Sequence, residues 1–408
     1  MLIAPKSLSS VLTSVLCISI TITSTVFLGG CSTSSAPGSS GGPGLPTLPP
    51  DPSRVPTFPP TTGVPPTSRP PPGNGCTGNR IGTYTWSQGY WREGDPSLIN
   101  FLDHPVGRQW NCGDLYINVA DASNHNRIKD EDKLVEWMKE WRKQSGSIGT
   151  VWLTYGDVVE KDGPKMVAFV QTFKHFLMRS VSPQDMALIA PMGISFDVEH
   201  VAEEYYEKAL IDAQTMKQEV TEGMGYLPGS IFVDCTIEGE KNVVETEFVM
   251  RHADRALMML YRNEVNGTYE DDLVERMKWM MTEQCVVCTQ PGWENLKAKI
   301  TIMVEGACEM GSGCKKLSMC AKDTTSYPDP AGGIQYVWDT LQELQRRMIS
   351  DGIVTQAQFD HLFDVNGTSF AIHNWEWSRC FYGDSFSQEM GFSNCQNYHP
   401  LASDCRML

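Results

Sequence analysis

The order of its strand-like and helix-like segments limits this chain to very few folds. Segments with the pattern of amphipathic helices begin near residue 130 and recur at about 165–178, 205–216, 245–254, 270–284 and 334–349. Apolar runs typical of buried β-strands alternate with them, at 81–86, 114–120, 150–155, 193–199, 230–237, 256–261, 300–305 and 369–375. Eight strands that alternate with helices within about 300 residues predict an α/β fold, the (β/α)8 TIM barrel.

Two segments of different composition precede the predicted barrel. Residues 1–30 have one early lysine and then an apolar run diluted with Ser and Thr, which is the pattern of a secretory signal peptide. Residues 31–75 are rich in Pro, Gly, Ser and Thr and predict a disordered linker, because they hold too few apolar side chains to offset the entropy of folding. We therefore expect a secreted, extracellular protein with one folded domain, residues 76–408, that ends in a Cys-rich tail.

Short motifs bear on the route of export. Leu28-Gly29-Gly30-Cys31 resembles a bacterial lipobox, and in a bacterial cell Cys31 would be lipidated after cleavage. Asn266 and Asn366 each begin an Asn-Gly-Thr sequon and would be glycan acceptors in a eukaryotic cell. Because these motifs point to different cells, a lipid-anchored form and a freely secreted form both stay open.

The folded part holds eleven cysteines, at positions 76, 112, 235, 285, 288, 308, 314, 320, 380, 395 and 405. In an exported protein these predict disulfides that staple the loops and the tail, with one cysteine left over. Cys235 lies inside a predicted strand, so we expect it to be the free, buried one. Cys285-Val-Val-Cys288 could also suggest zinc or redox chemistry, but the chain has no second CxxC pair to complete a zinc site.

The formal net charge of −16 disfavours nucleic acid and anionic membranes as partners. A neutral or cationic substrate suits this charge better. Nothing in the sequence predicts an obligate protein partner.

Two carboxylates share one face of the predicted fourth strand. Side chains alternate along a strand, so Ser195, Asp197 and Glu199 face the same way. Asp197 and Glu199 then lie roughly 6 to 7 Å apart, close enough for one charge to raise the pKa of the other carboxyl. A general acid that works near neutral pH needs such a raised pKa.

A TIM barrel places its chemistry at the carboxyl ends of its strands. Aromatic faces stack on pyranose rings and carboxyl groups deliver protons, so this combination of side chains suggests sugar binding. Carboxylates and aromatic side chains occur together at the predicted strand ends: Asp197, Glu199, Tyr261, Glu305, Trp375, Glu376 and Trp377.

These residues resemble the signature motifs of glycoside hydrolase family 18, the chitinases and their relatives. The segment from Met192 to Glu199 is similar to the family's Asp-x-x-Asp-x-Asp-x-Glu on strand four, with Met192 and Ser195 in place of the first two aspartates. Leu153-Thr-Tyr-Gly156-Asp157 is similar to the third-strand Ser-x-Gly-Gly. The other matching positions are Met259, Tyr261 and Arg262 for Met-x-Tyr-Asp on strand six, Trp375 for the tryptophan below the sugar, and Tyr84 and Trp86 on strand one.

The resemblance implies substrate-assisted, retaining hydrolysis of β-1,4-linked N-acetylglucosamine, with no metal or organic cofactor. Glu199 would protonate the glycosidic oxygen, while the sugar's N-acetyl carbonyl attacks its own anomeric carbon. Asp197 would hold the acetamido N–H, Tyr261 the carbonyl oxygen, and Trp375 would stack beneath the ring. The remaining substrate contacts would come from Tyr84, Trp86, Ser195, Met259, Glu305 and Trp377.

Departures from the signature leave alternatives open. Ser195 stands where an aspartate would share a proton with Asp197, and Arg262 replaces the aspartate after Tyr261. One alternative is a retaining clan-A-type glycosidase that uses Glu199 as acid/base and Glu305 as nucleophile, although that clan places Asn before its fourth-strand glutamate. The other is a chitinase-like carbohydrate-binding protein with weak or no turnover. The segment between strands seven and eight holds no inserted α+β domain pattern, so we expect a shallow cleft.

Overall fold

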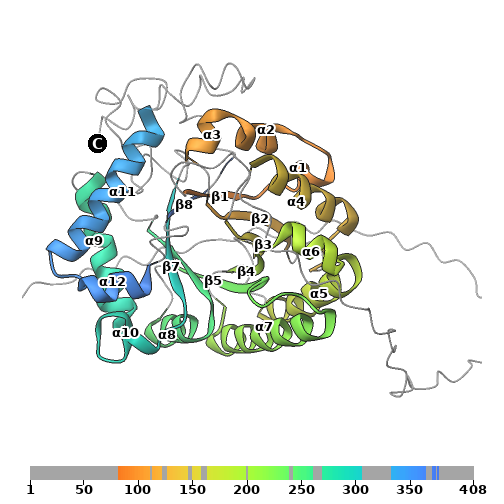
Figure 1. The fold of residues 1–408 in the computed structure, drawn as a ribbon. Coiled ribbons are helices and arrows are strands. Elements are labelled where there is room, and N and C mark those ends of the chain that lie inside the picture. The colour runs from red at the N-terminus through yellow and green to blue at the C-terminus, as the bar shows by residue number, and fades with distance from the viewer. Residues whose placement is uncertain are drawn as a thin grey trace, which may run out of the picture. The chain divides into compact units, whose positions relative to one another are not determined.

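Eight parallel strands close into one barrel in chain order, from β1 to β8, and β8 pairs with β1 (Figure 1). Helices follow the strands and surround the barrel, so the predicted (β/α)8 TIM barrel is confirmed. The computed structural model describes residues 81–110, 113–121, 126–145, 149–157, 163–198, 201–238, 242–260, 269–305, 332–363, 370–373 and 375.

The strands lie within two residues of the predicted bounds at either end. Each is a short run rich in branched and aromatic side chains that is buried on both faces, as the strands of a parallel barrel are. They are β1 Ile81–Thr85, β2 Leu115–Ala120, β3 Val151–Asp157, β4 Met192–Val198, β5 Ile231–Ile237, β6 Arg255–Met259, β7 Lys299–Glu305 and β8 Phe370–His373.

The helices include all the predicted ones, together with short helices that the periodicity did not indicate. The longer ones are α4 Glu131–Ser145, α5 Gly163–Ser180, α7 Glu203–Met224, α8 Val243–His252, α9 Tyr269–Trp279 and α11 Gly332–Ser350. The short ones are α1 Gly89–Arg92, α2 Ser97–Asp103, α3 Pro105–Trp110, α6 Pro183–Ile189, α10 Val286–Thr289 and α12 Gln356–Leu362. A π-helical turn, Met280–Gln284, continues α9, and a 3-10 turn spans Trp293–Asn295.

Local chemistry sets several helix ends. The hydroxyl of Ser182 accepts a hydrogen bond from the Asp185 amide, and the Asp185 carboxylate accepts one from the Ser182 amide, which caps α6. Thr355 and Gln358 cap α12 in the same way. Gly225 ends α7 at φ 68°, a left-handed conformation that favours glycine.

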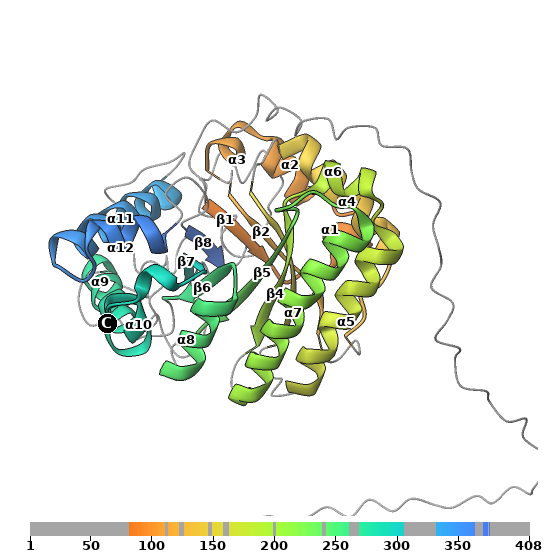
Figure 2. The same ribbon diagram turned by 60° about the horizontal axis from the view of Figure 1, so that its bottom comes forward.

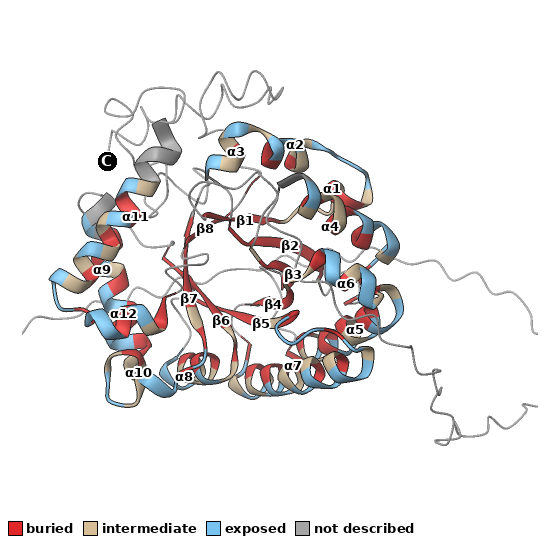
Figure 3. Ribbon diagram, in the orientation of Figure 1, coloured by how far each residue is buried: buried red, intermediate tan, exposed pale blue. Residues whose placement is uncertain are grey.

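The larger core lies between the barrel and its helices. Outward side chains of β4, such as Ile194 and Phe196, are fully buried there. Phe173 of α5 is also fully buried, between Phe169 and Phe176 along the predicted apolar side of the helix. In Figure 2, α5, α7 and α8 lie along the outside of their neighbouring strands, and Figure 3 shows the buried strands inside a ring of helices with exposed outer faces.

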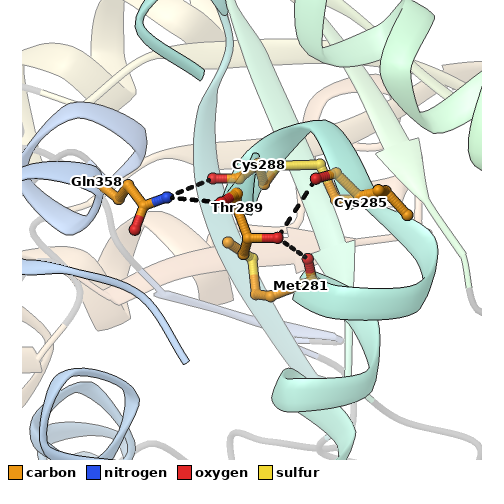
Figure 4. The surroundings of a disulfide bond; sticks show 6 residues. Met281, Cys285, Cys288, Thr289 and Gln358 are labelled. Atoms are coloured by element: carbon orange, nitrogen blue, oxygen red, sulfur yellow. Dashed lines mark hydrogen bonds between the residues drawn. A yellow bond between two sulfur atoms is a disulfide. The ribbon is translucent and has the colours of Figure 1, made fainter. Parts of the chain in front are cut away.

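Cys285 and Cys288 form a disulfide across the turn formed by α10, from the residue before this helix to its third residue (Figure 4). The side-chain amide of Gln358, on α12, donates to the backbone oxygens of Cys288 and Thr289 at 3.4 and 3.2 Å. The turn is therefore tied to the helix that leads into β8. Cys235 is buried and forms no disulfide with a described residue, as predicted; the other cysteines of the folded part lie outside the described residues.

The predicted signal peptide, linker and C-terminal tail also lie outside the described residues. Among the helices that the structure does describe, none is long and apolar enough to span a bilayer.

The core of α5 offers a direct test of packing. Phe173→Ala should lower the free energy of unfolding by about 3 to 5 kcal/mol, because it removes a fully buried ring and leaves a cavity. Met178→Ala on the same helix is the control; its side chain is 51% exposed, so the change should be within about 0.5 kcal/mol. Denaturant unfolding of both variants measures the difference, and equal effects would contradict this description of the core.

Candidate active site

Aromatic rings line the inside of the barrel and form a second core, separate from the one under the helices. Tyr84 of β1 stacks on Tyr116 of β2 at 5.8 Å between ring centroids, and Tyr116 stacks on Trp152 of β3 at 6.0 Å. Met259, a predicted substrate contact, closes this cluster from β6 and is 2% exposed. The rings exclude water from the barrel, so carboxyl groups among them lie in a medium of low polarity.

A buried ion pair lies beside this cluster. Asp114 precedes β2 and accepts hydrogen bonds from the Thr150 amide and the Trp152 indole, both at 2.8 Å. The guanidinium of Arg255, at the start of β6, lies 3.5 Å from the same carboxylate and donates to the Thr301 hydroxyl at 2.6 Å. Asp114 thus has a counter-charge and two further donors, which offset the cost of burying a carboxyl group.

A second carboxyl group, Asp234 of β5, is paired very differently. Its Oδ2 lies 2.5 Å from the hydroxyl of Ser195 on β4. Burial raises the pKa of Asp234 to about 8; the hydrogen bond from Ser195 and the charge of Arg255 oppose this rise, and the charges of Asp114 and Asp197 add to it. Asp234 is therefore a neutral acid at pH 7. Tyr116 is also fully buried nearby. Desolvation raises the pKa of the Tyr116 hydroxyl well above its usual value, and the charge of Asp234 adds to this rise.

The third carboxylate, Asp197, lies two residues further along β4, toward the carboxyl ends of the strands. The Tyr84 hydroxyl donates to its Oδ2 at 2.7 Å, and Asp197 is 4% exposed. Gly156 of β3 lies against it: a Cβ at this glycine would come within 3.1 Å of both the Asp197 Cβ and the Trp86 ring. Glycine at this position therefore lets both Asp197 and the Trp86 ring pack closely against β3.

Trp86 and His373 complete this end of the barrel. The indole of Trp86, just after β1, donates to Nε2 of His373 at the end of β8, at 2.6 Å. Their rings meet edge to face at 5.9 Å, and Tyr84 lies 5.1 Å from the imidazole. Because Nε2 accepts this bond, a neutral His373 carries its proton on Nδ1.

The structure brings together five of the residues that the sequence singled out, since Tyr84, Trp86, Ser195, Asp197 and Met259 all face the barrel interior. Trp375 lies elsewhere: its ring is fully buried in the outer core, 4.4 Å from Phe101 of α2. Glu199, Tyr261, Arg262 and Trp377 lie outside the described residues, as do the side chains of Asp157 and Glu305. Glu305 is the last residue of β7, and its backbone lies opposite that of His373 on β8.

Sequence reasoning missed four polar residues of the interior described above: Asp114, Asp234, Arg255 and His373. A signal was present for Asp234, because a single acid stands inside the apolar run Ile231-Phe-Val-Asp-Cys-Thr-Ile237 and alternation turns it inward. His373 is likewise a lone polar residue after Phe-Ala-Ile in β8.

Outside the barrel, a hollow of about 340 Å³ lies beside α2 and α4, lined by residues that include Tyr90, Asn100 and Trp137. None of the predicted site residues lines it. Within the described ranges no group of three or more His, Cys, Asp or Glu side chains is arranged to hold a metal ion.

No protein-family model matches the chain, and no curated protein sequence matches it. Among solved structures, the chain is similar to concanavalin B, with 11% identity over 78% of this chain and 97% of that one, at a TM-score of 0.38. A chitinase from Bacteroides thetaiotaomicron is 8% identical over 74% and 91% of the two chains, at 0.40. A glycoside hydrolase family 18 N-acetylglucosaminidase from Paenibacillus barengoltzii is 9% identical over 77% and 98%, also at 0.40. We therefore infer function from this chain's own residues.

The buried ion pair makes a prediction about stability. Asp114→Asn keeps the shape of the side chain but removes the negative charge that lies 3.5 Å from the Arg255 guanidinium, so it should cost about 3 to 5 kcal/mol of unfolding free energy. Glu247→Gln removes the partner of Arg251 in a surface pair and should cost about 1 kcal/mol or less. Equal losses in urea unfolding would mean that the Asp114 pair is not buried as described.

Asp234 makes a prediction about pH. Its folded pKa, about 8, is higher than the 3.8 of an unperturbed aspartate, so between these values the folded chain keeps a proton that the unfolded chain releases. Its contribution to stability is therefore full below about pH 4 and is lost as pH rises toward 8. Asn cannot titrate, so the unfolding free energy of Asp234→Asn relative to wild type should rise across this window. A constant difference from pH 4 to 9 would show that Asp234 is ionised in the fold.

Proposed function

We propose that the protein is a secreted glycoside hydrolase that cleaves β-1,4-linked N-acetylglucosamine, in chitin or a related glycan, by substrate-assisted retaining hydrolysis. The observation that carries this proposal is the hydrogen bond from Tyr84 to Asp197, with Trp86 close by, at the carboxyl ends of the barrel strands. A fixed carboxylate beside aromatic rings is the combination that an N-acetyl sugar requires, and it lies on the face where TIM barrels hold their active sites.

The proposed reaction assigns a task to each side chain. Glu199 follows Asp197 at the next inward-facing position of the sequence, and it protonates the glycosidic oxygen. Asp197 accepts the acetamido N–H and orients the N-acetyl oxygen for attack on the anomeric carbon. Tyr84 donates to Asp197 and so holds its carboxyl group in one rotamer. Tyr261 binds the acetyl oxygen.

One observation favours the second candidate, a chitinase-like carbohydrate-binding protein with weak turnover. Trp375, the ring that would stack beneath a distorted sugar, has no exposed surface and packs against Phe101. Without that platform the cleft would bind the glycan through Trp86 and the neighbouring polar groups but would distort the sugar less, and distortion contributes to catalysis.

Replacement of Glu199 tests the proposal. Glu199→Gln should lower kcat on N-acetylglucosamine oligomers by at least about 100-fold, the usual scale of general acid catalysis, while oligomer binding survives. Glu204→Gln, on an exposed position nearby, is the matched control and should keep wild-type turnover. A thiazoline mimic of the cyclised intermediate should inhibit the wild-type protein.

Other results of these assays would contradict the proposal or support one of the alternative functions. Equal turnover by Glu199→Gln and wild type would exclude Glu199 as the acid. Loss of turnover in Glu305→Gln, with little effect of Asp197→Asn, would indicate the clan-A-type mechanism instead. Oligomer binding without turnover in the wild-type protein would indicate the carbohydrate-binding protein.

A further inference from the structure

The inference concerns His373, the last residue of β8, which the proposed mechanism does not use. Its side chain is 7% exposed and lies at the carboxyl ends of the strands. The Trp86 indole donates to its Nε2 at 2.6 Å, and the two rings meet edge to face. The bond joins neighbouring strands, since β8 pairs with β1. His373 therefore accepts the one hydrogen bond that an indole can donate.

Trp86 is the ring of the interior cluster that a ligand at the barrel mouth can reach. Tyr84, Tyr116 and Trp152 of this cluster are at most 1% exposed, whereas Trp86 and Phe232 are partly exposed. Phe232 is the second residue of β5 and so lies near the base of the barrel. Trp86 directly follows β1, at the end of the barrel where TIM barrels bind their substrates.

The indole of Trp86 is held from several sides. Its N–H is bonded to His373 on β8, and its Cη2 atom, on the far edge of the ring, lies beside Gly156 of β3, where an added Cβ would come within 3.1 Å of it. Tyr84 packs against the ring at 5.2 Å between centroids, with the two planes 51° apart. Of these contacts the hydrogen bond is the directional one, so it sets the rotation of the ring.

We propose that His373 is a positioning residue for Trp86: by accepting the indole N–H, it holds the ring as a platform on which a pyranose ring of the substrate stacks. The apolar face of a pyranose suits an aromatic face. Trp375, the ring expected to come from β8, is buried against Phe101 in the outer core, so β8 supplies the acceptor for a ring of β1 instead.

The bond also determines what Trp86 can recognise. An indole has one donor and no acceptor, and His373 occupies that donor. Trp86 therefore offers a ligand its face and no hydrogen bond. The identity of the ligand, an N-acetylglucosamine oligomer, rests on the proposed function; the bond between Trp86 and His373 does not.

The first experiment compares two polar replacements of His373 in the full chain. The side-chain amide of glutamine reaches about as far as the imidazole Nε2, so His373→Gln can still accept the indole N–H. The amide of asparagine is one methylene shorter and reaches only as far as Nδ1, so His373→Asn cannot. Both variants keep a neutral polar side chain at this position, so a difference between them reports the bond to Trp86.

Oligomer binding is measured by calorimetry in the Glu199→Gln background, in which N-acetylglucosamine oligomers should bind without being cleaved. His373→Asn should raise Kd about 10-fold, the size expected for one aromatic stack, and His373→Gln should keep Kd close to that of the parent. His361→Asn is the control. His361 of α12 also meets a tryptophan edge to face, Trp293 at 5.2 Å, but it lies beside the Leu296 backbone oxygen before β7. Its replacement should leave Kd unchanged.

A double-mutant cycle tests whether His373 acts through Trp86. Trp86→Phe keeps an aromatic face but removes the N–H, so in that background His373→Asn should change Kd by less than about 2-fold. Equal losses with and without Trp86→Phe would show that His373 acts on binding by another route and would overturn the proposal. Equal Kd values for His373→Asn and His373→Gln would overturn it as well.

Nuclear magnetic resonance reports the bond without any ligand. In the ¹⁵N-labelled full chain, the indole signal of Trp86 is the one that Trp86→Phe removes. In His373→Asn this proton should shift upfield and exchange faster with solvent, because it has lost its acceptor, and in His373→Gln it should stay close to its wild-type position. A signal that His373→Asn does not move would overturn the proposal.

The two measurements separate failure of this inference from failure of the proposed function. A shifted Trp86 signal and weaker oligomer binding in His373→Asn, with no turnover by the wild-type protein, would mean that the hydrolase is wrong and the platform right. Wild-type turnover of the oligomers, together with a Trp86 signal that does not depend on His373, would overturn the inference while the function stands.

Discussion

The barrel interior excludes water, and the arrangement of this site depends on how that interior accommodates carboxyl groups. The interior is packed with stacked tyrosine and tryptophan rings, so each acid placed among them must find a counter-charge, find donors, or keep its proton. Asp114 has a cation and two donors, Asp197 has Tyr84 at the open end, and Asp234 has one serine hydroxyl. Three aspartates are therefore accommodated in different ways because their neighbours differ.

The three aspartates lie at different depths in the barrel, between its base at the amino ends of the strands and its mouth at the carboxyl ends. Arg255 lies at the start of β6, 3.5 Å from the Asp114 carboxylate, and its charge also lowers the pKa of Asp234. Asp197 lies at the other end, where Gly156 leaves room for the Trp86 ring beside it. Asp197, near the mouth, thus lies above polar residues that are buried deeper in the barrel.

The outer core and the barrel interior hold different kinds of side chains. Outward-facing strand residues and the phenylalanines of α5 are buried under the helices, while inward-facing positions carry the polar network. Trp375 belongs to the first set by its contact with Phe101, although it follows a strand end. A substitution in the helix layer should therefore act on folding, and one inside the barrel on both folding and the site.

The TIM barrel and the bounds of its strands could be read from the amino-acid sequence, because helix and strand periodicities are local and each segment carries its own pattern. The shared face of Ser195 and Asp197 was predictable for the same reason. The pairing of Ser195 with Asp234, of Trp86 with His373 and of Asp114 with Arg255 was not. These partners are 39, 287 and 141 residues apart in the sequence, and they meet only because the barrel closes in one register, which depends on how all eight strands pack together. Burial is also a property of the closed barrel, and burial is what turns an ordinary aspartate at position 234 into an acid that keeps its proton.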